Sequence, residues 1–196
     1  MRFLSLDDNL LRMRTIPREV LYFHQMKSSF VISEIQKAVL IGTLLGNGSL
    51  NKRGKEYRLH IKHSTSQLSF VEYKREIFKN ITSMPIHIFD QKVKDTLYHS
   101  AEFVTLTHSI FTEYYNLFYR EGKKNIPENI IDVFTNPLSV AIWFMDDGSS
   151  EYAGAAFHTQ CFTLLDLQIL QKVFRNSFHI RTTLRKKQTR MDHLYT

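Results

Sequence analysis

The chain has 196 residues, 43% of them hydrophobic and 23% charged, which suits one large domain or two small fused ones and excludes a disordered protein. Lysine and arginine outnumber aspartate and glutamate by 26 to 19, and the resulting net charge of +7 favours a polyanionic partner such as nucleic acid. The single cysteine, Cys161, excludes an intramolecular disulfide and a CxxC zinc site, and no apolar run is long enough to span a membrane.

The chain is expected to begin with an N-terminal arm over residues 1–32, which contains one short helix at 18–25. Ser33 and Gln36 then have the spacing of a capping box, with serine at the N-cap and glutamine three residues later. This pair predicts a helix over 34–45. Because that segment is apolar on nearly all sides, we expect the helix to be buried.

The next elements follow from alternation, helical spacing and turn residues. The pattern predicts a basic turn at 51–54, strands at 56–63, 86–92 and 96–107, helices at 67–81 and 108–119, and a loop at 121–128. The strand at 56–63 is expected to be half-buried, because apolar and basic residues alternate along it. The aromatic residues of 108–119 are interpreted as core.

The pattern then restarts with a second apolar helix at 138–145, a turn, a strand at 155–159, a helix at 164–178 and a strand at 180–185. Asn47-Gly48-Ser49 and Asp147-Gly148-Ser149 lie 100 residues apart. The repeat predicts an α/β fold with antiparallel strands in two pseudo-symmetric halves, at 33–136 and 137–196. The second half is shorter, and we expect it to lack a closing strand pair and a last helix.

Two strings carry a resemblance to a known family. Residues 40–48, LIGTLLGNG, and 141–148, AIWFMDDG, resemble the first and second copies of the LAGLIDADG motif. KKNIP before the second copy and HTQCFT after it are similar to strings of the mitochondrial omega-intron subfamily. The chain therefore resembles the LAGLIDADG homing endonucleases in their single-chain, two-motif form.

The resemblance implies a fold in which the two motif helices pack together through small residues, with Gly42 and Ala141 as candidates. Each helix would deliver its terminal acid to the base of a saddle of antiparallel strands that lies over double-stranded DNA. The implied cofactor is Mg²⁺ or another divalent cation such as Mn²⁺, which binds hard oxygen ligands. The resemblance also implies a monomer and an organelle, mitochondrion or chloroplast.

Asp147 is the strongest candidate site residue, because a helix macrodipole disfavours an acid at the C-terminal end. Asn47 stands where the resemblance requires the other acid, and an amide oxygen can ligate a metal without supplying charge. Asparagine is also an ordinary residue at a helix end. Gly46 and Asp146 complete the expected metal-binding positions, with Asp146 acting through its backbone carbonyl rather than its carboxylate.

Two further residues are candidates for the catalytic centre. Lys124 resembles the basic residue that flanks the family's active site, where it would polarise solvent or stabilise negative charge. Gln160 resembles a polar residue of the catalytic pocket. A solvated loop lysine and an ordinary strand-end amide are equally acceptable interpretations of these two residues.

The DNA-binding candidates are basic residues at alternating or clustered positions. Base readers are expected among Arg58, His60, Lys62, Arg181 and Arg185, and phosphate contacts among Lys52, Arg53, Lys186 and Lys187. Alternation alone would also fit a solvated sheet face.

The sequence thus predicts a site-specific DNA endonuclease that hydrolyses phosphodiesters with a divalent metal, and that is impaired or nicks one strand because of Asn47. One alternative is a cleavage-dead protein that binds DNA or intron RNA, as a maturase does. Another is a shortened product that does not fold stably, because a missing strand pair would expose a sheet edge.

Overall fold

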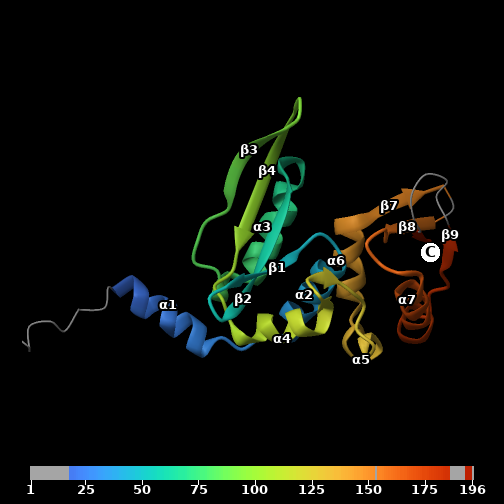
Figure 1. Ribbon diagram of the computed structural model, residues 1–196, viewed down its shortest axis with the longest axis horizontal. Coiled ribbons are helices and arrows are strands. Elements are labelled where there is room, and N and C mark those ends of the chain that lie inside the picture. Colours follow the sequence, from blue (N-terminus) through green and yellow to red (C-terminus); the bar gives the residue numbers. More distant parts are fainter. Residues whose placement is uncertain (1–17, 153, 186–192, 196) are drawn as a thin grey trace, which may run out of the picture.

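The computed structural model of the protein describes residues 18–152, 154–185 and 193–195. Figure 1 shows a sheet on either side of two central helices, α2 and α6. The helices are α1 (Arg18–Ser29), α2 (Glu34–Leu45), α3 (Leu68–Ile77), α4 (Ser109–Phe118), α5 (Ile130–Val133), α6 (Pro137–Asp147) and α7 (Leu164–Ser177). The strands are β1 (Ser49–Arg53), β2 (Glu56–Ser64), β3 (His87–Val93), β4 (Thr96–Val104), β5 (Tyr119–Arg120), β6 (Lys123–Lys124), β7 (Gly148–Glu151), β8 (Gly154–His158), β9 (Thr183–Arg185) and β10 (His193–Tyr195).

The two halves have the same sheet topology. The first sheet has the order β1-β2-β4-β3 and the second the order β7-β8-β10-β9, with every pair antiparallel. The expected loss of a closing strand pair is therefore wrong, because β9 and β10 pair with each other as β3 and β4 do. Strand β10 was missed because it has only three residues, too few to show alternation, and β9 was expected only as part of a longer strand at 180–185. No helix follows α7 within the described ranges.

Three other expectations need correction. Residues 51–53 belong to β1, and the turn is confined to 54–55, where Gly54 has a φ of 63°. The chain after α6 forms β7 rather than a turn, and the strand expected at 180–185 begins only at 183. In each case the start and end of the strand depend on its pairing with a neighbouring strand, which the local sequence predicts poorly.

The two central helices approach each other closely. Helix α2 begins with the expected capping box, and α6 begins with Asn136 as N-cap and Pro137 in its first turn. A Cβ atom at Gly42 would overlap the backbone carbonyl oxygen of Ser139 and the side chain of Ile142. Gly42 is thus a contact position, as expected, but Ala141 is not, because it faces outward and Ile142 is buried in its place.

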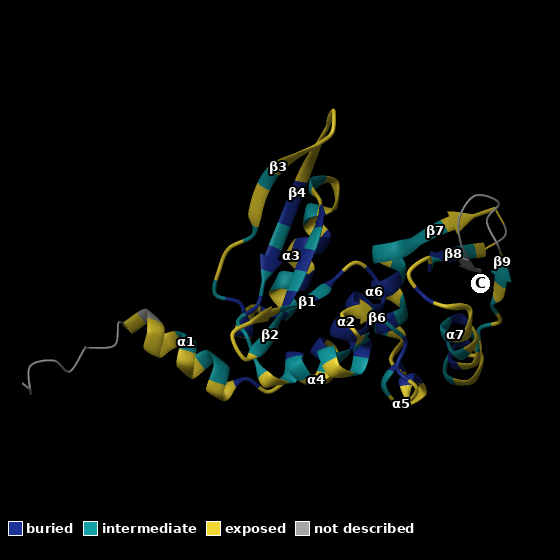
Figure 2. Cartoon of the chain, in the orientation of Figure 1, coloured by how far each residue is buried: buried dark blue, intermediate teal, exposed yellow. Residues whose placement is uncertain are grey.

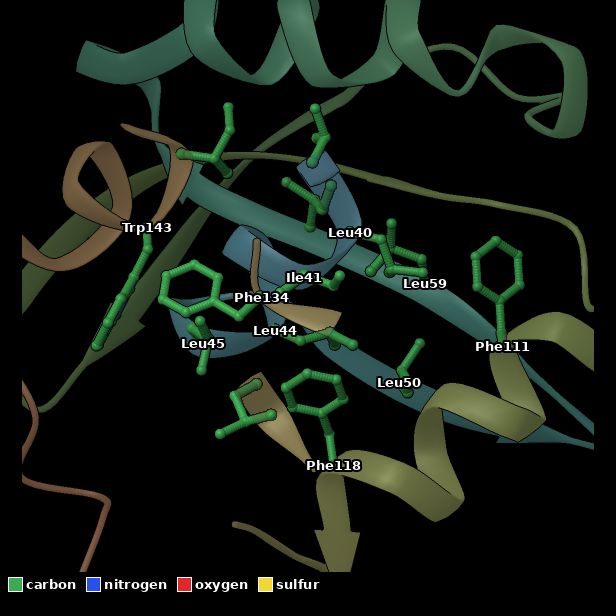
Figure 3. Packing of buried hydrophobic residues seen from close by; sticks show 14 of the residues in the cluster. Leu40, Ile41, Leu44, Leu45, Leu50, Leu59, Phe111, Phe118, Phe134 and Trp143 are labelled. Carbon is green, nitrogen blue, oxygen red and sulfur yellow. The ribbon is translucent and has the colours of Figure 1, made fainter. Parts of the chain in front are cut away.

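The core of the first half lies between α2, the sheet and α4. Figure 3 shows Leu40 and Leu44 of α2 grouped with Leu59 of β2, and Phe111 and Phe118 of α4 close by. All five side chains are buried, which agrees with the core interpretation of the aromatic residues in α4. Dark blue, buried segments in Figure 2 are concentrated in α2 and in the strands next to it.

Helix α1 projects from the body and is largely exposed (Figures 1 and 2). Its last turn is attached through Lys27, whose Nζ donates to Glu56 Oε2 at 2.7 Å and to Thr107 Oγ1 at 3.0 Å. No single helix among the described residues is long and apolar enough to span a membrane. The bent pair formed by 20–29 and 34–45 passes the same test on length and composition alone.

Candidate active site

The C-terminal ends of α2 and α6 lie side by side. Asn47, just after α2, donates from Nδ2 to the backbone carbonyl oxygen of Asp146 at 2.9 Å. The two motif ends that the sequence placed 100 residues apart thus meet at one place, and the polar groups carried by them form the candidate site.

Asp147 is the last residue of α6 and is half-buried. Its pKa is raised to about 6, mainly by burial and also by the negative charge of Asp146, while Lys124, Lys74 and the amide of Asn47 oppose the shift. The carboxylate is therefore ionised at neutral pH but held at an energetic cost. Such a group gains from a nearby cation.

This cost predicts a pH dependence of stability. The pKa of Asp147 is higher in the folded chain than its ordinary value of 3.8, so its protonated form favours folding. We expect the free energy of unfolding of the metal-free protein to fall, relative to that of Asp147→Asn, as pH rises from about 4 through about 6. Urea denaturation of both proteins at several pH values measures this difference. A difference that is constant over this range would contradict the raised pKa.

Lys124 of β6 lies at the same place, as expected for a flanking lysine. Its Nζ donates to the carbonyl oxygen of Gly46 at 2.6 Å, and burial lowers its pKa. The negative charge of Asp147 acts on it and opposes this shift. Lys124 is therefore a tethered cation beside the acid rather than a solvated loop lysine.

Gln160 lies in the exposed turn between β8 and α7. The charges of Lys124 and Asp147 both act on the thiol of the next residue, Cys161. The turn that carries Gln160 therefore approaches the candidate site.

Asp146 forms an ion pair that the sequence did not predict. Its carboxylate is fully buried and forms an ion pair with Lys74, with 2.6 Å between Oδ1 and Nζ. The same Oδ1 lies 3.4 Å from Nε2 of His63, and Oδ2 has no hydrogen-bond partner within the described part of the chain. Burial raises the pKa of Asp146, and the charge of Lys74 opposes this shift. The carboxylate is thus unavailable to a ligand from outside.

Lys74 and His63 were not among the candidate residues predicted from the sequence. Lys74 lies on the apolar stripe of α3, three residues after Val71 and four before Phe78, and its side chain is fully buried. A lysine on such a stripe signals a buried acid partner, because an unpaired buried ammonium is very costly. His63 occupies an inward-facing position of β2, beyond Leu59 and Ile61.

The oxygen atoms of the site fit a divalent cation of the Mg²⁺ type at Asp147. Asp147 supplies the carboxylate and Asn47 an amide oxygen, and Mg²⁺ commonly takes one or two carboxylates with water and phosphate. The carbonyl oxygens of Gly46 and Asp146 already accept hydrogen bonds from Lys124 and Asn47. The described residues hold no group of three His, Cys, Asp or Glu that could bind a metal. The donor set thus fits one cation with ligands from solvent or substrate, and not a pair of cations between two carboxylates.

The basic residues of β2 share one face of the first sheet. His60 pairs with Glu102 at 2.9 Å, and Lys62 donates to Gln91 at 2.8 Å. A polar hollow on this face is lined by His60, Lys62 and Asn47. Because Asn47 belongs to the candidate site, the hollow is continuous with that site. Arg53 and Arg58 belong to the same face by register, because Arg58 pairs with Asn51 and Arg53 with Glu56.

The other DNA-binding candidates are more scattered. Lys52 pairs with Tyr57 and so lies on the opposite face of the first sheet. Arg181 precedes β9 and lines a hollow beside α7, so it is not part of an alternating strand. Arg185 is exposed at the end of β9, and Lys186 and Lys187 lie outside the described residues.

Comparison with known proteins gives a consistent result. The sequence model of the LAGLIDADG DNA endonuclease family matches residues 37–195. Cytochrome b mRNA maturase bI2 of Saccharomyces cerevisiae is 29% identical over 161 residues, which cover 76% of this chain but only 38% of that protein.

Two solved structures bear on the fold. The homing endonuclease I-WcaI, solved bound to its DNA recognition sequence, is 22% identical, with a TM-score of 0.81 over 95% of this chain and 85% of that chain. I-DmoI, solved in complex with DNA and Mn, is 15% identical, with a TM-score of 0.50 over 84% of this chain and 90% of that chain. The α/β fold predicted from the sequence is thereby confirmed.

Proposed function

Because this chain belongs to the LAGLIDADG DNA endonuclease family, we propose that it is a site-specific DNA endonuclease with one effective metal centre, at Asp147. The observation that carries this proposal is the meeting of Asp147, Asn47 and Lys124 at the ends of α2 and α6. The basic face of the first sheet opens onto the same place. We further propose that the protein acts as a monomer on double-stranded DNA, in the organelle of the gene that hosts it.

The reaction is hydrolysis of a phosphodiester. A water oxygen forms a bond to phosphorus, the bond to the 3′ oxygen breaks, and a proton passes to that leaving oxygen. A divalent cation, Mg²⁺ or Mn²⁺, would neutralise the phosphate and lower the pKa of the attacking water. Asp147 would hold the cation with its carboxylate. Lys124 would add positive charge beside the phosphate, and Arg58, His60 and Lys62 would contact the DNA.

The direct test uses the intronless allele of the gene that hosts the protein, incubated with protein and Mg²⁺. We expect a nick in one strand, because Asn47 supplies no carboxylate for a second centre. A double-strand break would mean that the Asn47 half also binds a cation. Specific binding without any cleavage would contradict the endonuclease proposal.

Asn47→Asp is expected to increase cleavage of the second strand. The substitution provides a carboxylate in the half that lacks one, and a bound metal ion supplies several kcal/mol of transition-state stabilisation. It also replaces the donor that faces the carbonyl oxygen of Asp146, so the metal-free variant should be less stable than wild type. Strand-labelled duplexes measure the first effect and urea denaturation with EDTA the second.

Asn129→Asp is the matched control, because Asn129 is exposed, precedes α5 and makes no side-chain capping bond. We expect it to change neither measurement. If Asn47→Asp gives no additional cleavage, the missing acid is not what limits the second strand.

A second candidate function is that of an RNA-binding maturase without cleavage. It is favoured by Asn47 in the place of an acid and by the relative named as a maturase. Competition between intron RNA and the intronless duplex separates the two. The maturase alternative requires preferential binding of the RNA and splicing that survives Asp147→Asn.

A further inference from the structure

A buried ion pair joins the two halves directly below the site. Lys74 of α3 belongs to the first half and Asp146 of α6 to the second, and both side chains have no exposed surface. His63 of β2 completes the cluster: its Nε2 lies 3.4 Å from both Lys74 Nζ and Asp146 Oδ1, and its Nδ1 contacts Gln67 Oε1 at 3.0 Å. The Lys74 ammonium also lies 4.2 Å from the ring centroid of Phe70.

Packing does not require charges at these positions. Ser49 pairs with His60 in the first half, and Ser149 pairs with Ala156 in the second, so a residue of β2 corresponds to the residue 96 positions later in β8. Helices α3 and α7 begin at residues 68 and 164, so the same offset relates them. Lys74 then corresponds to Leu170 and His63 to Thr159, while Gly46 is the counterpart of Asp146. Leu170 and Thr159 are fully buried, so the second half fills the equivalent space without a buried lysine.

A buried ion pair is a costly way to fill space. Removing two charges from water costs several kcal/mol per ion, and apolar replacements of similar volume are often as stable or more stable. What the pair can provide instead is a fixed geometry for the end of α6. That end needs fixing, because helix ends fray and the macrodipole disfavours two successive acids there.

We propose that Lys74 is a positioning residue for the reaction: through its ion pair with Asp146, supported by His63, it fixes the last turn of α6 and directs the Asp147 carboxylate toward the bound cation. The inference rests on the proposed function. Asp146 is anchored against the first half, and the adjacent Asp147 is then held at the side of Asn47 and Lys124. His63 also lines the polar hollow on the sheet face, so the same cluster connects that face to the acid.

The test compares wild type with the double variant Lys74→Leu/Asp146→Ala, which removes both charges and leaves neither unpaired. We expect its affinity for Mn²⁺, measured by electron paramagnetic resonance, and its single-turnover cleavage rate to fall about 10- to 100-fold, as for other residues that orient metal ligands. The urea midpoint should stay at or above its wild-type value. The affinity for the duplex should not change, because neither side chain is exposed. The exposed pair Lys79 and Glu76, 2.5 Å apart, provides the matched control Lys79→Leu/Glu76→Ala, which should change none of these quantities.

Wild-type Mn²⁺ affinity in a folded double variant would overturn the proposal, because the pair would then only fill space. If the double variant does not fold, His63→Thr, which copies Thr159 and keeps the ion pair, decides the matter. We expect lower Mn²⁺ affinity, and an unchanged value would overturn the proposal. Failure of wild type to cleave any duplex would refute the proposed function, while the comparison of Mn²⁺ affinities would still test the positioning.

Discussion

Asp147→Asn is expected to abolish DNA cleavage, with a loss of at least about 1,000-fold in the single-turnover rate. A bound metal ion supplies several kcal/mol of transition-state stabilisation, and each 1.4 kcal/mol corresponds to about a factor of ten. Asp147 is the available carboxylate among the described groups at the site, since that of Asp146 is buried in an ion pair. The substitution preserves shape and removes the charge, so binding of the duplex should persist.

The pattern of residual products is as informative as the rate. With one effective centre, Asp147→Asn should leave no nick in either strand. Asp132→Asn, an exposed acid of α5, is the matched control and should cleave as wild type does. Residual nicking of one strand by Asp147→Asn would mean that the Asn47 half holds its own cation. Cleavage within about tenfold of wild type would place the chemistry elsewhere.

Gly42→Ala is expected to destabilise the protein by about 1–3 kcal/mol or more, the range for overpacking a close-packed core. Intrinsic helix propensity alone predicts the opposite sign, because alanine favours a helix interior over glycine by about 1 kcal/mol. The added methyl group would overlap the carbonyl oxygen of Ser139, a backbone atom that can move only with α6. The two helices must therefore separate, which also moves Asp147 away from Asn47.

Urea denaturation measures the loss of stability, and strand-labelled cleavage measures the displacement. The control is Gly54→Asn, at a turn where nothing lies within 4 Å of an added Cβ and where asparagine tolerates the positive φ. We expect the control to remain within about 0.5 kcal/mol of wild type. A Gly42→Ala variant more stable than wild type would show that the helices do not depend on this close contact.

Sequence patterns predicted the elements that carry strong local signals. The capping box of Ser33 and Gln36 marks the start of α2, and the segments of β2 and α7 each contain enough residues to define a period. The family resemblance implied that the two motif helices pack together, and Asn47 does meet the end of α6. Strands of three or four residues, such as β7 and β10, contain too few positions to show a period, so they could be found only by their pairing.

The site residues that belong to a recognisable sequence motif were predicted. Residues that reach the site from elements distant in the sequence were missed. Lys124 lies beside Asp147, as the flanking string implied. Asp146 was expected to act through its backbone carbonyl, and no partner for its carboxylate was predicted. Its partner, Lys74, lies 72 residues earlier on another helix. Only the three-dimensional packing of α3 against α6 brings the two charges together.

The contact between Gly46 and Asp146 makes the two halves non-interchangeable at their interface. A Cβ at Gly46 would overlap the Asp146 side chain, and Lys74 has its acid only in the other half. A dimer of two first halves would bury two copies of Lys74 without an acid partner. A dimer of two second halves would place two copies of Asp146 against each other. Either arrangement leaves ions unpaired at several kcal/mol each. Neither half could therefore form the same interface with a second copy of itself.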